Sequence, residues 1–249
     1  MITRADFKRI LFLDIETVPC AEYYAHMEDR LRDLWDYKAG RIRERDKQLE
    51  VLTCEDLFYE QGGIFAEFGR IVAIGVGVIH EQQGYTMMRT KCFASEDEIA
   101  LLIAFNQVLE RYDQPSLILC AHNGKEFDFP YIARRMLING IRLPYSLLLH
   151  GKKPWEIPHL DTLELWKFGD RKSYTSLDLL AAVFGIPSSK AEMDGSEVRR
   201  VFYEEKNLEK VARYCAHDVI NAAQVLLRMS GMPIIEPEYV EPVRVEILT

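Results

Sequence analysis

Two carboxylates lie two residues apart near the N-terminus, directly after an apolar run. Residues 8–14 (KRILFLD) have the composition of a short buried strand, with Asp14 at its end and Glu16 just beyond. In a strand, residues i and i+2 point to the same face, so these carboxylates would raise each other's pKa unless a cation lay between them. Oxygen ligands of this kind suit Mg²⁺ or Mn²⁺. The alternative is that the strand ends at Asp14 and both side chains are solvated.

A third carboxylate, Asp128, follows a second apolar run at residues 116–121 (SLILCA). It lies between Phe127 and Phe129, ahead of a helix that has Pro130 in its first turn. An aspartate at this place could also serve as the helix N-cap, which is a common role for Asp. The position therefore fits either a metal ligand or a cap.

A fourth carboxylate, Asp218, falls on the apolar face of a helix that we expect at 207–229. The buried stripe of this helix has i, i+4, i+7 spacing and consists of Val211, Cys215, Asp218, Ala222 and Val225. A carboxylate on such a face is costly unless it is paired or binds a metal. Tyr214 lies four residues earlier, and therefore beside Asp218 on the same face. An ion pair with an arginine, or a capped neighbour, is the alternative explanation for Asp218.

These separate segments can meet in one crevice. In an open α/β sheet, ligands bind where strand ends face the neighbouring helices. Four carboxylates gathered there can hold two cations about 3.5–4 Å apart, which is the arrangement used for in-line phosphoryl displacement.

The elements that would position these residues follow an α/β order. We expect strands and helices to alternate along the chain and to form one mixed central sheet with helices on both faces. The expected strands are 8–14, 70–79, 85–93, 116–121 and 157–160; the expected helices follow Ser95 and Gly124 and then occupy 176–184, 195–205 and 207–229. Residues 1–230 are predicted to be a single domain. It would carry a charged helical insertion at about 20–60 and be followed by an extended, proline-containing tail at 231–249.

Composition limits the class of protein. The 249 residues are 48% hydrophobic and carry a net charge of −8, which argues against disorder and against indiscriminate coating of nucleic acid. The five cysteines form no close pair, the N-terminus does not have the pattern of a signal peptide, and no run is apolar enough for a membrane span. We therefore expect a reduced, cytoplasmic protein with no membrane partner.

Taken in order, three motifs resemble those of the DEDD superfamily of 3′-5′ exonucleases, which have a ribonuclease H-like fold. The motifs are Asp14-Ile-Glu16, residues 123–128 and Tyr214-Cys-Ala-His-Asp218. Members with a catalytic histidine carry it five residues before the last aspartate, where this chain has Arg213; members with a tyrosine carry it four before, at Tyr214. The chain thus resembles the tyrosine branch, DEDDy.

Within that branch the sequence is most similar to the predicted stand-alone exonucleases related to the proofreading domain of family-B DNA polymerases. Residues 157–161 (IPHLD) and 172–178 (KSYTSLD) add to this resemblance, which covers roughly residues 8–230. It implies hydrolysis of phosphodiester bonds from the 3′ end of single-stranded nucleic acid, with DNA favoured over RNA, by a mechanism that uses two divalent cations, Mg²⁺ or Mn²⁺. The sequence identifies no polymerase or repair partner.

The resemblance also implies roles for five residues. Asp14 would bridge both cations, Glu16 and Asp218 would complete the tightly held site, and Asp128 would support the second site, partly through water. Tyr214 would orient the attacking water. One alternative is an inactive nucleic-acid-binding module, which would be expected to lack one or more carboxylates; none is missing. A metal protein without nuclease activity is another alternative, and it would leave Tyr214 without a task.

Substrate contacts are weaker predictions. The candidates are Asn123, Phe127, Lys172 and Tyr174. Phe127 could stack on the terminal base or pack in the core, while Lys172 and Tyr174 could contact substrate or lie in a solvated loop. Asp161 could support the metal site, but Asp161-Thr-Leu-Glu164 also has the pattern of a capping box, which we prefer. His217 is expected to be structural, since it points about 100° away from Asp218 on a helix.

Overall fold

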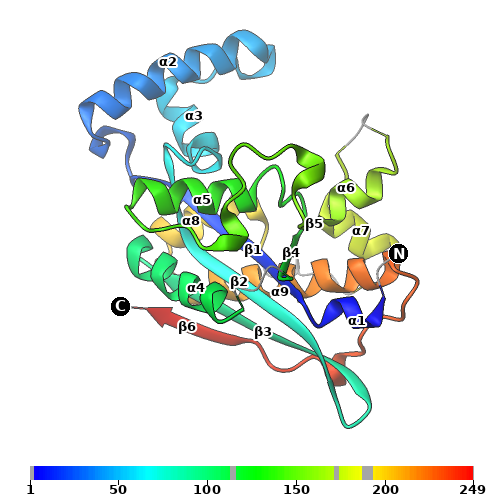
Figure 1. Ribbon diagram of the computed structural model, residues 1–249. Coiled ribbons are helices and arrows are strands. Elements are labelled where there is room, and N and C mark those ends of the chain that lie inside the picture. The colour runs from blue at the N-terminus through cyan, green and yellow to red at the C-terminus, as the bar shows by residue number, and fades with distance from the viewer. Residues whose placement is uncertain (1–2, 113–115, 171–173, 187–192, 249) are drawn as a thin grey trace.

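A six-stranded mixed sheet forms the centre of the protein in this computed structural model, which describes residues 3–112, 116–170, 174–186 and 193–248 (Figure 1). The strands lie in the order β5-β4-β1-β2-β3-β6. The pairs β1–β2 and β2–β3 are antiparallel, whereas β1–β4, β4–β5 and β3–β6 are parallel. Their bounds are β1 (Ile10–Pro19), β2 (Gly69–Gln82), β3 (Tyr85–Ser95), β4 (Ile118–Ala121), β5 (Leu160–Asp161) and β6 (Arg244–Leu248). The predicted mixed α/β sheet flanked by helices is therefore confirmed.

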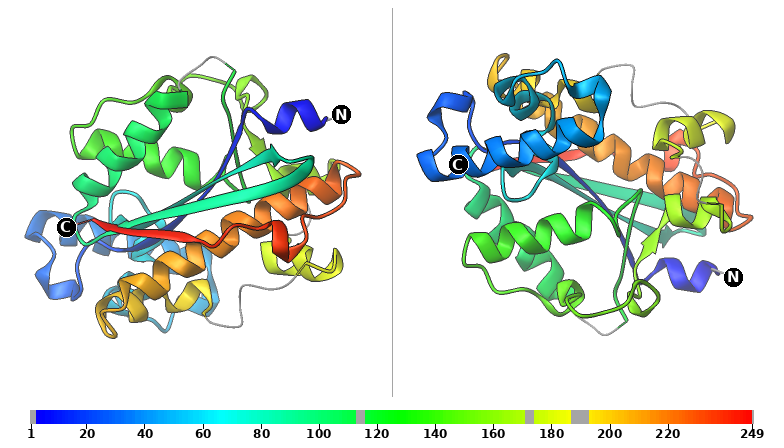
Figure 2. Two further views of the ribbon diagram at one scale, coloured as in Figure 1. Left: turned by 90° about the horizontal axis from the view of Figure 1, so that it is seen from below. Right: turned by 90° about the horizontal axis from the view of Figure 1, so that it is seen from above.

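Helices cover both faces of this sheet, with α4 and α5 on one side and α9 on the other (Figure 2). The α-helices are α1 (Arg4–Phe7), α2 (Asp29–Arg45), α3 (Cys54–Gln61), α4 (Glu98–Tyr112), α5 (Asp128–Ile138), α6 (Thr162–Lys167), α7 (Leu177–Val183), α8 (Val198–Tyr203) and α9 (Leu208–Met229). Short 3-10 turns are η1 (Tyr24–His26), η2 (Lys47–Leu49), η3 (Gly62–Ile64), η4 (Tyr145–Leu147), η5 (Pro154–Glu156), η7 (Gly195–Glu197) and η8 (Pro237–Tyr239). Among the described helices, none is long and apolar enough to cross a bilayer.

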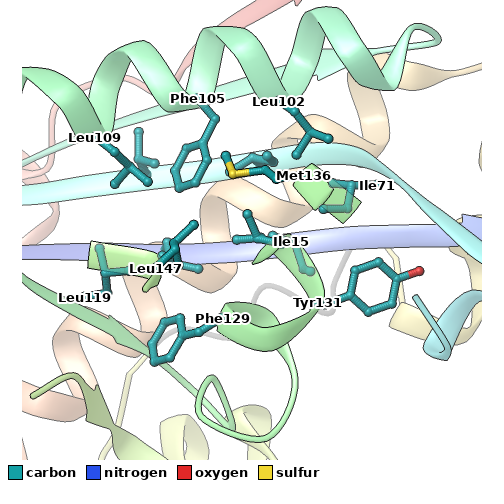
Figure 3. Close-up of a cluster of buried hydrophobic side chains, with 14 of the residues drawn as sticks. Ile15, Ile71, Leu102, Phe105, Leu109, Leu119, Phe129, Tyr131, Met136 and Leu147 are labelled. Carbon is teal, nitrogen blue, oxygen red and sulfur yellow. The ribbon is translucent and has the colours of Figure 1, made fainter. Parts of the chain in front are cut away.

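The larger core lies between the sheet and the helices α4 and α5 (Figure 3). Alternate residues of β1, among them Leu13 and Ile15, point into it and meet Phe105 of α4 and Phe129 of α5. These four side chains are at most 5% exposed. Because strand side chains alternate, the residues between them, including Asp14 and Glu16, point to the opposite face, toward α9.

Two glycines of β2 let α9 approach the sheet closely. A Cβ atom on Gly75 would lie 2.8 Å from Val219 Cγ2 and 3.1 Å from Cys215 Sγ, and one on Gly77 would lie 2.8 Å from Val219 Cγ1. Gly75 pairs with Asp14 across the sheet. The absence of side chains here therefore sets the distance between α9 and the strand that carries the first acidic pair.

Gly75→Ala should consequently lower stability by about 1–3 kcal/mol, the usual cost of overpacking a filled core. Urea unfolding followed by circular dichroism measures this loss. Gly40→Ala is the matched control, because nothing lies within 4 Å of a Cβ on Gly40, within α2. Alanine there should stabilise by about 0.5–1 kcal/mol through helix propensity. Equal stabilities for Gly75→Ala and wild type would contradict the close approach.

The charged segment at about 20–60, which the sequence predicted to be an insertion, contributes most of a separate small core. Trp35 of α2 is fully buried against Phe58 of α3 and Phe68, and its indole Nε1 donates a 2.7 Å hydrogen bond to the Cys54 carbonyl. The helices α2 and α3 stand at one end of the sheet, above α5 in Figure 1.

The C-terminal segment, which the sequence predicted to be an extended tail, adds a sixth strand to the sheet. β6 pairs in parallel with β3 over five positions. The strand begins only after Pro242, since proline lacks the N–H that the ladder requires. Before it, the buried amide of Gln224 on α9 binds both the N–H and the carbonyl of Ile235, which fixes the segment against that helix.

Candidate active site

Asp14 and Glu16 both lie within β1, which continues to Pro19. The alternative that the strand ends at Asp14 is therefore wrong. Glu16 is 8% exposed and Asp14 is half-buried. Burial raises the pKa of both carboxyls well above the usual range, and the charge of Glu16 raises that of Asp14 further.

Asp128 reaches β1 from α5 (Asp128–Ile138), at the edge of β1 that β4 leaves unpaired. β4 pairs with β1 only between Ile10 and Phe12, so the edge of β1 beyond Phe12 is free of β4. The Ile15 N–H there donates to Asp128 Oδ1 at 3.2 Å. Asp128 is the first residue of α5 and Phe127 occupies the N-cap position, so the capping alternative is wrong. Burial, with a smaller contribution from the charge of Asp161, raises the pKa of Asp128 to about 8.

Tyr214 and Asp218 reach the same place from α9. Tyr214 is 8% exposed, and its hydroxyl hydrogen-bonds to Asp218. Burial raises the pKa of Tyr214 far above its ordinary value, and the charges of Asp218, Glu16 and Asp14 add to the shift. The hydroxyl is therefore held in its protonated form at neutral pH.

The four carboxylates form one cluster. The charges of Glu16, Asp128 and Asp218 all raise the pKa of Asp14, and those of Asp218 and Asp128 raise the pKa of Glu16. A cleft of about 260 Å³ opens beside them, lined by Asp14, His122, Tyr174, Ser176, Leu177, Asp178, Asp194, Gly195, Tyr214 and Asp218.

The cluster fits divalent cations. Asp14 Oδ2 is buried and has no hydrogen-bond partner, which is a costly state for a carboxylate oxygen unless a cation faces it. Hard oxygen donors in this number suit Mg²⁺ or Mn²⁺. Cys215, which the sequence placed only in the buried stripe of α9, has its Sγ within 4.8 Å of carboxylate oxygens of Asp14 and Glu16. Its thiol also donates to the Asp14 carbonyl at 3.3 Å.

Asp161 organises the turn that leads to Asp128. Its carboxylate caps α6 by accepting from the N–H groups of Leu163 and Glu164, so the N-cap half of the expected capping box is present. The Glu164 carboxylate instead pairs with Lys125 Nζ at 2.6 Å. The Asp161 carboxylate also accepts from the N–H groups of Asn123 and Lys125 at 2.9 and 3.1 Å. Asn123 has a φ of 63°, a left-handed conformation that asparagine tolerates.

His122 is a site residue for which sequence analysis gave no role. Its Nε2 lies 2.9 Å from the Thr175 carbonyl, which can only accept, so Nε2 carries the proton. Nδ1 lies 2.9 Å from Thr162 Oγ1 and accepts from that hydroxyl, because burial lowers the pKa of His122 and keeps the ring neutral. The imidazole thus ties the segment at Tyr174 to α6. Its position directly before the Asn123-Gly124 turn was the sequence feature that could have identified His122 as a site residue.

The four substrate-contact candidates have different outcomes. The ring of Tyr174 is 66% exposed at the rim of the cleft. Phe127 packs against Tyr131 and the main core instead, with ring centroids 5.3 Å apart, which corresponds to the core alternative. Asn123 contributes its backbone N–H to the turn described above. Lys172 lies outside the described residues.

Divalent metal should stabilise the fold, because four clustered carboxylates repel one another in the metal-free protein. A ligand that binds only the folded state adds about 2.7 kcal/mol at a concentration 100 times its Kd. Thermal melts in EDTA and in millimolar Mn²⁺ should differ accordingly, and calorimetry should detect Mn²⁺ binding. Identical melts together with no heat of binding would contradict the metal site.

Two DNA polymerases are similar to this chain in sequence or in fold. A DNA polymerase from Pyrococcus glycovorans is 25% identical over 202 residues, which are 70% of this chain and 24% of the polymerase. The structure of the family B DNA polymerase from Pyrobaculum calidifontis matches with a TM-score of 0.51 and 16% identity over 88% of this chain and 24% of that chain. This structural match shows the shared fold and agrees with the ribonuclease H-like sheet expected from sequence. The chain thus spans about a quarter of the length of either polymerase.

The family model described as "Predicted 3'-5' exonuclease related to the exonuclease domain of PolB" matches residues 64–236. This range contains β2 to α9, and therefore Asp128, Tyr214 and Asp218, and it ends in the segment before β6. More than half of the chain is covered, and the sequence motifs had indicated the same relationship. The chain belongs to the family of predicted 3′-5′ exonucleases related to the exonuclease domain of PolB.

Proposed function

We propose that the protein is a metal-dependent exonuclease that removes nucleotides from the 3′ end of single-stranded nucleic acid, with DNA favoured over RNA. One observation carries this proposal: buried and half-buried carboxylates from β1, α5 and α9 form a single cluster beside Tyr214, and within it the buried Asp14 Oδ2 has no hydrogen-bond partner. Such a cluster is costly to maintain, so its presence favours a function that requires it. All five members of the set implied by the sequence motifs are present.

The carboxylates have the task of holding two cations. Asp14 lies centrally, since the charges of the other three all act on it, and it is the residue best placed to bridge. Glu16 and Asp218 would complete one site, and Asp128, fixed by the Ile15 N–H, would support the other. When bound, two cations lower the pKa of a water and stabilise charge on the leaving 3′ oxygen.

In this proposal Tyr214 positions the attacking water and does not act as a base. A phenol whose pKa is raised by burial keeps its proton at neutral pH, so it can donate a hydrogen bond but cannot accept a proton from water. Its hydroxyl hydrogen-bonds to Asp218 in the metal-free site. With substrate in the cleft, we assign it the task of orienting the attacking water toward the scissile phosphate.

Tyr174 offers a stacking surface for the terminal base. Its exposed ring lies at the rim of the cleft, and His122 fixes the backbone beside it through the Thr175 carbonyl. Stacking of this kind is worth about 1–3 kcal/mol per base and tolerates every base. It therefore agrees with an exonuclease that shows little sequence preference.

The decisive experiment uses one oligonucleotide labelled at either end, with Mn²⁺ and with EDTA. A 3′-5′ exonuclease releases the 3′ label at once as a mononucleotide, while the 5′-labelled strand shortens stepwise. Both reactions should stop in EDTA. Binding without cleavage in Mn²⁺ would instead support the inactive binding module, and neither binding nor cleavage would overturn both proposals.

A further inference from the structure

The helix α2 of the insertion has two different faces. Trp35 and Ala39 point inward and are fully buried in the insertion core. Beside this buried face, about 100° around the helix, Leu34, Lys38, Arg41 and Arg45 follow one another at intervals of four, three and four residues, so they form a stripe along the helix. Leu34 is 52% exposed, although it is apolar.

This stripe borders an open groove of about 740 Å³, whose other wall is the segment around Phe65. The groove combines aromatic rings with cations. Tyr37 is 68% exposed beside it, and Lys38 Nζ lies 3.9 Å from the centre of the Phe65 ring. Cations beside an exposed ring are typical of surfaces that bind single-stranded nucleic acid, in which bases stack and phosphates pair with cations.

The charge of the groove is opposite to that of the whole protein, whose net charge is −8. Three cations line the groove against one carboxylate, Glu67. Within the described part of the chain, Lys38 and Arg45 form no ion pair, while Arg41 reaches Glu44 only at 3.8 Å with both side chains more than half exposed. Such an exposed pair is weak. Arg41 also donates a 3.2 Å hydrogen bond to the Tyr37 hydroxyl and Lys38 lies over the Phe65 ring, so a phosphate backbone would compete only with exposed or neutral contacts.

The groove lies close in sequence to the catalytic strand. β1 carries Glu16 and ends three residues later at Pro19, where the segment with α2 begins. A strand rises about 3.3 Å per residue, so this segment starts about 10 Å from Glu16. The family model begins at Ile64, so β1, with Asp14 and Glu16, and α2 both lie outside the part of the chain that it matches. A surface that follows directly on the strand of the first acidic pair can hold the same substrate at a second place.

We propose that the groove between α2 and Phe65 binds the single strand upstream of the 3′ end held at the carboxylate cluster. This inference rests on the proposed exonuclease function for the identity of the strand. A protein partner fits the groove less well, because the cores of protein interfaces are depleted in lysine and in unpaired charge. The chemistry recognised is a phosphate backbone with unstacked bases.

The first test measures binding alone, in EDTA, so that cleavage plays no part. Fluorescein-labelled oligothymidylates of two lengths, a 6-mer and a 24-mer, are titrated with wild type and with the triple variant Lys38→Gln, Arg41→Gln, Arg45→Gln. Glutamine keeps most of the aliphatic stem, and therefore the packing, while it removes the charge. The variant should bind the 24-mer roughly 10–10²-fold more weakly, and its salt slope should fall by about 2, or about 0.7 for each of three lost phosphate contacts.

The matched control removes three exposed cations elsewhere, through Arg111→Gln, Arg142→Gln and Arg228→Gln. It changes the net charge equally and should leave the salt slope near wild type. Tyr37→Ala should also weaken binding of the 24-mer, while Tyr37→Phe should keep most of it, because stacking needs the ring and Phe loses only the hydroxyl that accepts from Arg41. Melting curves in EDTA check that every variant is folded.

Cleavage in Mn²⁺ gives a second, separate measurement. The triple Gln variant should raise KM for the 24-mer toward the value for the 6-mer and leave kcat unchanged. Unaltered 24-mer affinity, salt slope and KM in a folded variant would overturn the groove proposal, even if the exonuclease activity is found. Conversely, a protein that cuts nothing but loses 24-mer binding in the variant would retain the groove and refute the exonuclease.

Discussion

Asp14→Asn should leave the protein folded and lower the rate of cleavage by roughly 10³-fold or more, because it removes the carboxylate best placed to bridge two cations. The side chain keeps its shape. Its Oδ2 has no hydrogen-bond partner in the fold, so the substitution breaks no contact at that atom. Single-turnover rates at saturating Mn²⁺ measure the effect.

Melting temperatures make this test sharper. The pKa of Asp14 is raised by burial and by its acidic neighbours, so its charged form is less favourable in the folded state than in the unfolded chain. A neutral asparagine removes that cost, and in EDTA the variant should melt at or above the temperature of wild type. In Mn²⁺ it should melt below wild type, since it has lost a ligand.

Asp33→Asn on α2 serves as the control, because Asp33 is exposed and lies in the insertion. Both its activity and its response to Mn²⁺ should equal those of wild type. Near-normal turnover by a folded Asp14→Asn protein would refute the role assigned to Asp14. A large loss of stability in EDTA would show that the carboxylate is needed for folding.

Tyr214→Phe should lower kcat by roughly 10–10³-fold while metal binding and KM stay near wild type. The substitution removes only the hydroxyl, and this hydroxyl is not one of the groups expected to bind the metal ions. Calorimetric titration with Mn²⁺, followed by single-turnover cleavage, separates the two effects. Asp218→Ala should be more severe, since it removes a ligand as well as the partner of the hydroxyl.

The pH dependence of the rate distinguishes positioning from base catalysis. Because burial keeps the Tyr214 hydroxyl protonated, the rate profiles of wild type and Tyr214→Phe should have the same shape and differ only in height. A rise or fall of the rate with pH that is present in wild type and absent in Tyr214→Phe would show that the phenol titrates during catalysis.

Tyr203→Phe is the matched control for loss of a buried phenol. The Tyr203 hydroxyl donates to the Pro19 carbonyl at 2.7 Å, away from the carboxylates. Its removal should lower stability by about 1 kcal/mol and leave kcat unchanged. If Tyr214→Phe behaved in the same way, Tyr214 would be a packing residue and the branch assignment would lose its functional meaning.

The sequence by itself determined which residues share a face. Alternation along β1 and the 3.6-residue period of α9 are local properties, so they place Asp14 with Glu16 and Tyr214 with Asp218 without knowledge of the fold. The order of strands and helices likewise indicated the mixed α/β class. These predictions required only the spacing of residues within a single strand or helix and the order of those elements along the chain.

The tertiary structure decided the contacts between elements. Asp128 meets the Ile15 N–H, 113 residues away, because β4 stops pairing with β1 at Phe12, and no local pattern encodes where a partner strand ends. Phe127 packs in the core, and its sequence position alone did not exclude a base contact. The C-terminal segment becomes β6 because the edge of β3 offers it hydrogen bonds, and proline content alone could not reveal that edge. Long-range pairing depends on the whole chain, whereas periodicity depends on a few adjacent residues, and this difference separates what the sequence determined from what the fold decided.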